Sequence, residues 1–202
     1  MTTAIADETC GLRERKKQLT RRDLHRAALE IAREHGVDAT TVDAIAARAG
    51  VSTRTFFNYF ATKDDALLGN DPTMEERARA MVEAAPDDEP VRRVVRRLFD
   101  TQVTSLREDP DLWRLRREIT LVEPVLAARM LGSWVRVDKV IVDSVVERAH
   151  RLAGRRKVDE LAVAVEVYAA LGAGRAAFRQ HVVEGLEGDL DALLDRAYSL
   201  LG

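Results

Sequence analysis

The segment VSTRTFFNYF, residues 51–60, combines hydrogen-bonding side chains with an unusual number of aromatic rings. Its threonines, Arg54 and Asn58 carry hydroxyl, guanidinium and amide groups, which are the groups that bond base edges and phosphates in protein–DNA complexes. Three phenylalanines and a tyrosine alternate with them. A buried strand would not contain Arg54 and Asn58, and an ordinary surface helix would not contain so many rings. The segment therefore needs a core on one side and a polar partner on the other.

A helix-turn-helix provides both environments. Residues 42–49 predict one helix, which Thr40 or Thr41 begins, and residues 53–60 predict the next, which Ser52 caps. Gly50 supplies the positive φ that a tight turn between them requires. The second helix of such a motif enters the major groove of DNA, which is about 12 Å wide. The spacing turns Phe56 inward and leaves an outward set: Thr53, Arg54, Thr55, Phe57 and Asn58.

Two further helices flank this pair. Thr20 followed by Asp23 resembles a capping box, so we expect the first helix to begin there and to stop at Gly36. Thr62 and Asp65 form a second capping pair that opens a fourth helix. Phe60 is better explained by core packing than by DNA contact, whereas Tyr59 fits either a core position or a phosphate contact at its rim.

The stretch TTVDAIAARAGVSTRTFFNYFATKDDAL resembles the N-terminal domain of the tetracycline-repressor (TetR) family of bacterial regulators, over about residues 18–70. The resemblance implies a repressor that binds a palindromic operator in double-stranded DNA as a homodimer and is released by a small apolar or amphipathic molecule. It implies phosphate contacts by Thr41 and Lys63 at helix N-termini and base reading led by Thr53 and Arg54. It further implies phosphate and base contacts from Thr55, Phe57, Asn58 and Tyr59. Many members have tyrosine where this chain has Phe57, which keeps the ring but cannot donate a hydrogen bond.

Charge is distributed unevenly along the chain. The net charge of the 202 residues is −2, yet residues 13–26 contain seven lysines and arginines against two acidic residues. A basic segment on an acidic body indicates a polyanionic partner, although such a run is also common in solvated, flexible tails. We expect residues 1–17 to form a flexible basic arm, residues 18–66 the DNA-binding domain, and residues 67–202 a domain that binds ligand and dimerises.

The remaining sequence predicts an all-α protein, with a small three-helix DNA-binding domain joined to a helical bundle. Alanine, leucine, arginine and glutamate dominate a composition that is 46% hydrophobic and 33% charged. Pro86–Pro90 and Asp109-Pro110 interrupt the helical pattern, a long helix is expected from Pro124 to about Ala153, and Asp159 and Asp189 begin the last two helices. The absence of a signal sequence or a long apolar run, together with a single cysteine, favours a cytoplasmic protein without a membrane partner.

The segment LAVAVEVYAALGAGRAAF, residues 161–178, is apolar nearly all round. A helix that buries one stripe is polar elsewhere, so this helix requires two apolar partners. A central core helix in a monomer would satisfy the pattern. We expect a homodimer instead, through helices at about 159–183 and 189–201, because a palindromic operator requires two-fold symmetry.

The chain contains no sequence pattern for catalysis, metal binding or a cofactor: its four histidines are far apart, and no phosphate-binding glycine loop or nucleophile motif occurs. A small-molecule effector would bind among apolar side chains between bundle helices. The candidates are Gln102, Trp113, Arg117, Trp134, Tyr168 and Phe178, each of which core packing or solvation would also explain. The alternative function is a small helical ligand-binding protein without DNA activity.

Overall fold

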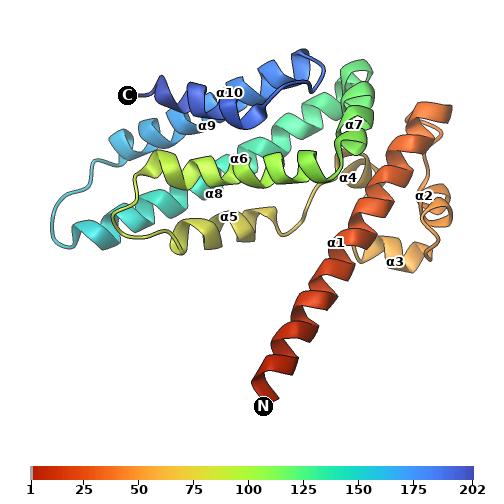
Figure 1. The fold of residues 1–202 in the computed structure, drawn as a ribbon, viewed down its shortest axis with the longest axis horizontal. Helices are drawn as coiled ribbons and strands as arrows, with labels where there is room; N and C mark the ends of the chain where they lie inside the picture. Colours follow the sequence, from red (N-terminus) through yellow and green to blue (C-terminus); the bar gives the residue numbers. More distant parts are fainter. Residues whose placement is uncertain (1) are drawn as a thin grey trace. The chain divides into compact units, whose positions relative to one another are not determined.

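The structure, a computed structural model, describes the backbone of residues 2–202 and the side chains of residues 15–202. Within that part the chain forms ten α-helices and no strand, which confirms the predicted all-α class (Figure 1). The helices form two units. The N-terminal unit contains Met1–Pro72 and Glu118–Ala128, and the C-terminal unit contains Thr73–Arg117 and Arg129–Gly202. The division thus falls at Pro72, six residues after the expected end of the DNA-binding domain, and residues 118–128 join the first unit.

The N-terminal unit begins with the helices α1 (Thr2–His35), α2 (Val42–Arg48), α3 (Thr53–Phe57) and α4 (Lys63–Leu68). α1 packs on α2 and α4, and α2 packs on α3. The predicted start at Thr20 is wrong, because α1 continues through it and the Thr20 hydroxyl donates to the carbonyl of Lys16 at 3.1 Å. The backbone of residues 2–17 is likewise helical, and the side chains of residues 1–14, which include Arg13 of the basic segment, lie outside the described part.

Side-chain caps set the starts of the three short helices as the sequence predicts. The hydroxyls of Thr41, Ser52 and Thr62 accept from the backbone N–H of the third residue of α2, α3 and α4, at 3.1–3.2 Å. Gly50 has φ of +67° in the turn between α2 and α3. α3 ends at Phe57, three residues before the predicted end, because the amide of Asn58 bonds the carbonyl of Thr55 and closes a tighter turn.

The C-terminal unit contains α5 (Met74–Glu83), α6 (Val91–Glu108), α9 (Glu160–Val183) and α10 (Leu190–Ser199), together with most of α7 (Pro110–Val122) and α8 (Pro124–Ala153). α6, α9 and α10 pack against one another, and α5 packs on α6. Salt bridges from Arg96 and Arg107 to Asp191 fasten α6 to the start of α10 at 3.1 and 2.6 Å. The predicted breaks at Pro86–Pro90 and Asp109 are confirmed, as are the caps at Asp159 and Asp189.

The inner face of α9 is closely packed at Gly174. A Cβ atom at this position would lie 2.2–2.5 Å from the ring of Phe99 on α6, a distance that no side chain tolerates without a shift of the ring. Gly172, two residues earlier, is exposed, and a Cβ there would meet nothing within 4 Å. The two glycines therefore mark opposite sides of one helix, one inside the bundle and the other on its surface.

One histidine is buried in this core. His181, on the last turn of α9, is 1% exposed, and neither ring nitrogen has a hydrogen-bond partner among the described residues. Burial lowers the pKa of His181 below its usual value, because the charged imidazolium loses its hydration, while the carboxylate of Glu184, the backbone of Glu187 and the carboxylate of Asp189 act in the opposite direction. Its folded state therefore favours the neutral ring.

We expect the free energy of unfolding to fall as the pH drops below about 6.5, the pKa of histidine in an unfolded chain. Below that pH the unfolded state binds a proton that the folded state resists, so the loss reaches at most about 1.4 kcal/mol for each pH unit until the folded pKa is passed. Urea unfolding at fixed protein concentration between pH 8 and 5 measures this dependence. His181→Leu should remove it, whereas a control, His150→Gln at an exposed position, should leave it. An equal slope in wild type and His181→Leu would contradict the assignment.

Candidate DNA-binding interface

The predicted DNA-contacting residues all fall in the N-terminal unit, within the helix-turn-helix of α2 and α3 or directly after it. Thr41 caps α2, Lys63 begins α4, and the other six follow one another from the start of α3 to the turn after it. Phe56 in the same helix is fully buried. The five-residue helix thus separates one core side chain from a row that faces outward, which is the division of roles expected from the sequence.

The exposed part of this row offers complementary groups to DNA. Arg54 and Asn58 are exposed, and Phe57 is 56% exposed with its ring at 5.5 Å, edge to face, from that of Phe56. An arginine can bond guanine O6 and N7 together, an asparagine can do the same with adenine N6 and N7, and an apolar ring can contact a thymine methyl. The surface can therefore bond base edges, through side chains that come from α3 and the residue after it.

Besides Thr41, which caps α2, three of the predicted contact residues have side-chain partners inside the unit. The Lys63 ammonium donates to the carbonyl of Val37 at 3.0 Å, which holds the N-terminus of α4 beside the turn that follows α1. The Thr55 hydroxyl lies 2.8 Å from that of Ser52. The Thr53 hydroxyl donates to the Asp43 carboxylate on α2 at 2.9 Å. These bonds fix the side-chain directions before any DNA arrives.

Charged side chains of α1 contact the helix-turn-helix on the side opposite its exposed row. Arg21 is 8% exposed, pairs with Asp71, lies over the ring of Phe60, and donates to the carbonyl of Tyr59 at 3.1 Å. Arg21 is part of the basic segment that indicated a polyanionic partner, but the structure places it inside the unit, where it pairs with Asp71. Farther along α1, Glu34 accepts both guanidinium bonds of Arg48 at 2.8 and 2.7 Å, and these bonds hold the pKa of Glu34 below its usual value.

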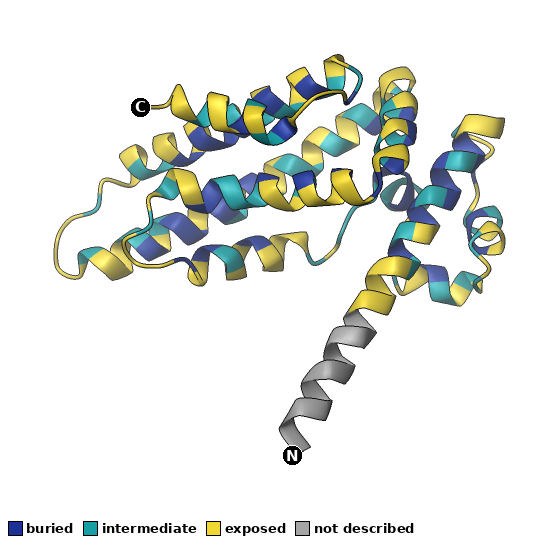
Figure 2. Cartoon of the chain, in the orientation of Figure 1, coloured by how far each residue is buried: buried dark blue, intermediate teal, exposed yellow. Residues whose placement is uncertain are grey.

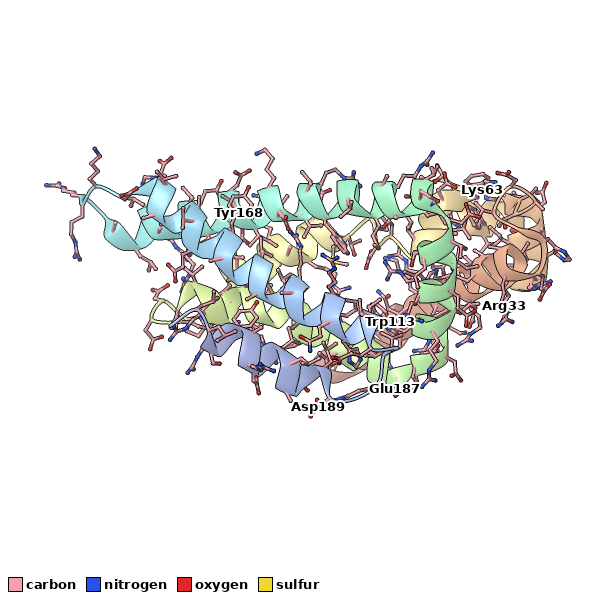
Figure 3. The ribbon with its side chains drawn as sticks, turned by 90° about the horizontal axis from the view of Figure 1, so that it is seen from above. Arg33, Lys63, Trp113, Tyr168, Glu187 and Asp189 are labelled. Atoms are coloured by element: carbon pink, nitrogen blue, oxygen red, sulfur yellow. The ribbon has the colours of Figure 1, made fainter. Side chains whose placement is uncertain are left out.

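The candidate effector residues lie in the C-terminal unit but do not form one group. Trp113 and Phe178 meet edge to face at 5.3 Å between α7 and α9, and Arg117 donates to the carbonyl of Val182 at 2.7 Å near the same end of α9. Trp134 on α8 instead lies under Arg175, 5.5 Å from ring to guanidinium. Gln102 is half-buried on α6. Tyr168 is 53% exposed near the other end of α9, well apart from Trp113 (Figure 3).

Three polar residues near these helices were not identified from the sequence. Asp138 on α8 pairs with Arg175 on α9, and Arg116 lies over the Trp113 ring at 5.2 Å. Burial lowers the pKa of Arg116 to about 10, because the desolvated guanidinium is less stable in its charged form. No local pattern pairs residues that are 37 positions apart, so such contacts between helices require the structure.

Taken together, the three-helix motif with its outward row and the helical C-terminal unit define a DNA-binding regulatory protein. The family model for bacterial regulatory proteins of the TetR family matches residues 24–68, and the model for the MftR C-terminal domain matches residues 89–202, more than half of the chain. The chain belongs to the TetR family of transcriptional regulators, which confirms the resemblance seen in the sequence.

Individual relatives agree with this assignment. The helix-turn-helix transcriptional regulator TcmR of Streptomyces glaucescens is 40% identical over 79 residues, which are 39% of this chain and 35% of TcmR. A fatty acid metabolism regulator of Clostridium perfringens shares the fold with a TM-score of 0.51 at 15% identity, over 87% of this chain and 94% of that one. The fatty acid degradation regulator FadR of Bacillus halodurans has the same TM-score at 20% identity, over 89% and 96%.

Proposed function

We propose that this chain is a cytoplasmic repressor that binds a palindromic operator as a homodimer and is released by a small apolar or amphipathic molecule. The observation that carries the DNA-binding part is the division of α3: Phe56 is fully buried, while Arg54 and Asn58 beside it are exposed. A short helix with polar residues outside and an aromatic anchor inside can enter the major groove without losing its own core.

In this proposal the contact residues have different tasks. Thr53 and Arg54, at the start of α3, read bases. Thr41 and Lys63 contact phosphates on either side, and Thr55, Phe57, Asn58 and Tyr59 add base, sugar and phosphate contacts. Lys63 can keep its bond to the Val37 carbonyl and also contact a phosphate, since an ammonium has three donors and that carbonyl uses one.

The surface of α9 supports the homodimer. An exposed apolar row runs along the helix at spacings of three and four residues, over Leu161, Val165, Ala169, Gly172 and Ala176 (Figure 2). Val183 continues it seven residues further on, past the exposed Arg179. α9 is long and apolar enough to cross a membrane, and only 28% of its apolar 18-residue stretch is buried within the chain. Most of that stretch is therefore open to a partner. Its inner side packs on α6 and α10, and it carries Glu166, Arg175 and Arg179, which a lipid environment disfavours. A second copy of the chain would cover the row.

The packing of Trp113 against Phe178 supports an effector site between α7 and α9, with Arg117 at its edge. Rings and aliphatic neighbours favour an apolar ligand, and the guanidinium groups of Arg116 and Arg117 favour one with a polar or anionic end. Release of DNA requires that the ligand bind more tightly to a conformation whose recognition helices are not about 34–36 Å apart, the spacing of successive major grooves.

Two single substitutions test DNA binding. We expect Arg54→Ala to weaken binding to the preferred operator by about 1–3 kcal/mol and to relax the choice of base at one position, because a bidentate contact is lost. Lys63→Ala should weaken all sequences about equally and reduce the salt slope by about one ion. Fluorescence anisotropy with operator and with unrelated duplex, at several salt concentrations, separates the two effects. Equal binding by wild type and both variants would refute this assignment of the contact residues, and the absence of wild-type binding to any duplex would favour the alternative of a ligand-binding protein without DNA activity.

The two glycines of α9 test the dimer. Gly172→Glu places a charge on the exposed row and meets nothing in the monomer, so we expect a folded monomer. Gly174→Glu drives a side chain into the Phe99 ring, so we expect loss of fold instead. Sedimentation velocity at micromolar concentration, with circular dichroism for folding, reports both. An interface of about 2,000 Å² or more is expected for the wild-type dimer, and a wild-type monomer would refute the proposal.

Effector and operator must oppose each other by equal factors. If an effector lowers the affinity of the protein for operator tenfold, bound operator must lower the affinity of the protein for that effector tenfold. This factor is about 1.4 kcal/mol of coupling free energy. Candidate molecules can be found by loss of operator anisotropy from a panel of amphipathic acids and alcohols, and calorimetry with and without operator then measures the coupling. Phe178→Ala should weaken effector binding while operator affinity without effector stays unchanged. Equal effector affinity with and without operator would exclude this mode of release.

A further inference from the structure

The hydroxyl of Thr53 has a fixed direction because of an acidic residue on the neighbouring helix. Thr53 is the first residue of α3, and Asp43 lies in the first turn of α2. The Thr53 Oγ1 donates to Asp43 Oδ1 at 2.9 Å. A threonine hydroxyl has one proton and two lone pairs, whereas an ionised carboxylate can only accept. The proton of Thr53 is therefore committed to Asp43, and the oxygen can only accept from a third group.

Bases differ in what they offer to such an acceptor. In the major groove, adenine N6 and cytosine N4 carry amino groups that donate, whereas guanine O6 and N7 and thymine O4 only accept. A free threonine hydroxyl bonds either kind, because it can turn its proton toward the base. With its proton held by Asp43, Thr53 can bond the amino bases alone, and the carboxylate beside it repels the keto oxygens.

We propose that Asp43 is a specificity-determining residue, which makes the pair Asp43–Thr53 an acceptor-only reader that selects an amino base, adenine or cytosine, over a keto base. This inference rests on the proposed role of Thr53 as a base reader. Asp43 does not itself need to contact DNA, because it acts through the proton of Thr53 and through its charge.

The neighbouring reader has the opposite polarity. Arg54 is exposed and offers only donors, which suit guanine O6 and N7. Two consecutive residues of α3 thus present acceptors and donors side by side, so each half of the operator should contain one position that selects amino bases and another that selects guanine. A negative charge on a surface that approaches phosphates weakens DNA binding in general, and the selection of bases gives the Asp43 carboxylate a function there.

Binding-site selection from a randomised duplex pool, followed by affinity measurements, tests the proposal. The Thr53 position is the one whose preference disappears in Thr53→Val. There we expect wild type to favour adenine and cytosine over guanine and thymine, on the strand that Thr53 faces, by about three- to tenfold. Asp43→Ala should bring that ratio close to one, since the hydroxyl can then donate to keto oxygens. Asp43→Leu, which keeps a side chain of similar size but has no acceptor for the Thr53 proton, should do the same. Asp38→Asn removes a charge at an exposed position of the same unit and should leave the ratio unchanged.

The outcomes separate this inference from the proposed function. If Arg54→Ala changes the selected operator but Asp43→Ala weakens all sequences equally at an unchanged ratio, then Asp43 only joins α2 to α3 and the inference is wrong. A wild-type preference for keto bases, or for purines over pyrimidines, at the Thr53 position would also overturn it. If wild type selects no sequence at all, base reading by α3 fails and the inference fails with it. Thermal unfolding of each variant accompanies these measurements, and Asp43→Leu decides the matter if Asp43→Ala does not fold.

Discussion

The surface proposed to contact DNA depends on the burial of one ring, that of Phe56. α3 has only five residues, and a helix of that length is not stable by itself, since few of its backbone hydrogen bonds close within it. Complete burial of a phenylalanine contributes about 1.5–3 kcal/mol, and the Ser52 cap adds about 1 kcal/mol. The recognition helix is thus held from inside by tertiary packing, which leaves its outward residues available for DNA.

Buried polar residues of α1 connect the segment after α3 to α4 and the linker that follows it. The buried guanidinium of Arg21 joins α1 to the end of the recognition segment at Tyr59 and to Asp71, in the linker after α4. His25, one turn further along, bonds the carbonyl of Ala66 at 2.6 Å, and Gly69 approaches the ring so closely that a Cβ would lie 2.9–3.1 Å from it. A buried charge is costly without its partner, so movement of the linker away from α1 would disturb Arg21 and, through it, the turn after α3. The linker and the DNA-binding surface are therefore coupled within this unit.

Local chemistry explains which features the sequence predicted and which it did not. Caps at Thr41, Ser52 and Thr62, the turn at Gly50 and the core position of Phe56 are decided by residues within a few positions of each other, and all are confirmed. The predicted start of the first helix at Thr20 was wrong, because a threonine hydroxyl can bond a carbonyl inside a helix, here that of Lys16, as well as cap a new helix. Arg21, Asp43 and His181 acquire their roles from residues on other helices, so periodicity could not reveal them. The DNA-contacting and effector residues remain predictions, and for the effector set the structure brings Trp113 and Phe178 together but places Tyr168 apart.

The two faces of α9 show why its apolar composition is informative only together with the structure. Residues 161–178 are apolar nearly all round the helix, yet Gly174 lies against Phe99 in the bundle, whereas Gly172 faces solvent. A monomer gains nothing from an exposed row of leucine, valine and alanine, which costs solubility without adding to the core. A helix that must be apolar on both faces is explained when one face stabilises the bundle and the other joins a second copy. The same symmetry would place two copies of α3 on one face of the duplex, so the composition of α9 and the palindrome expected of the operator would have a common cause.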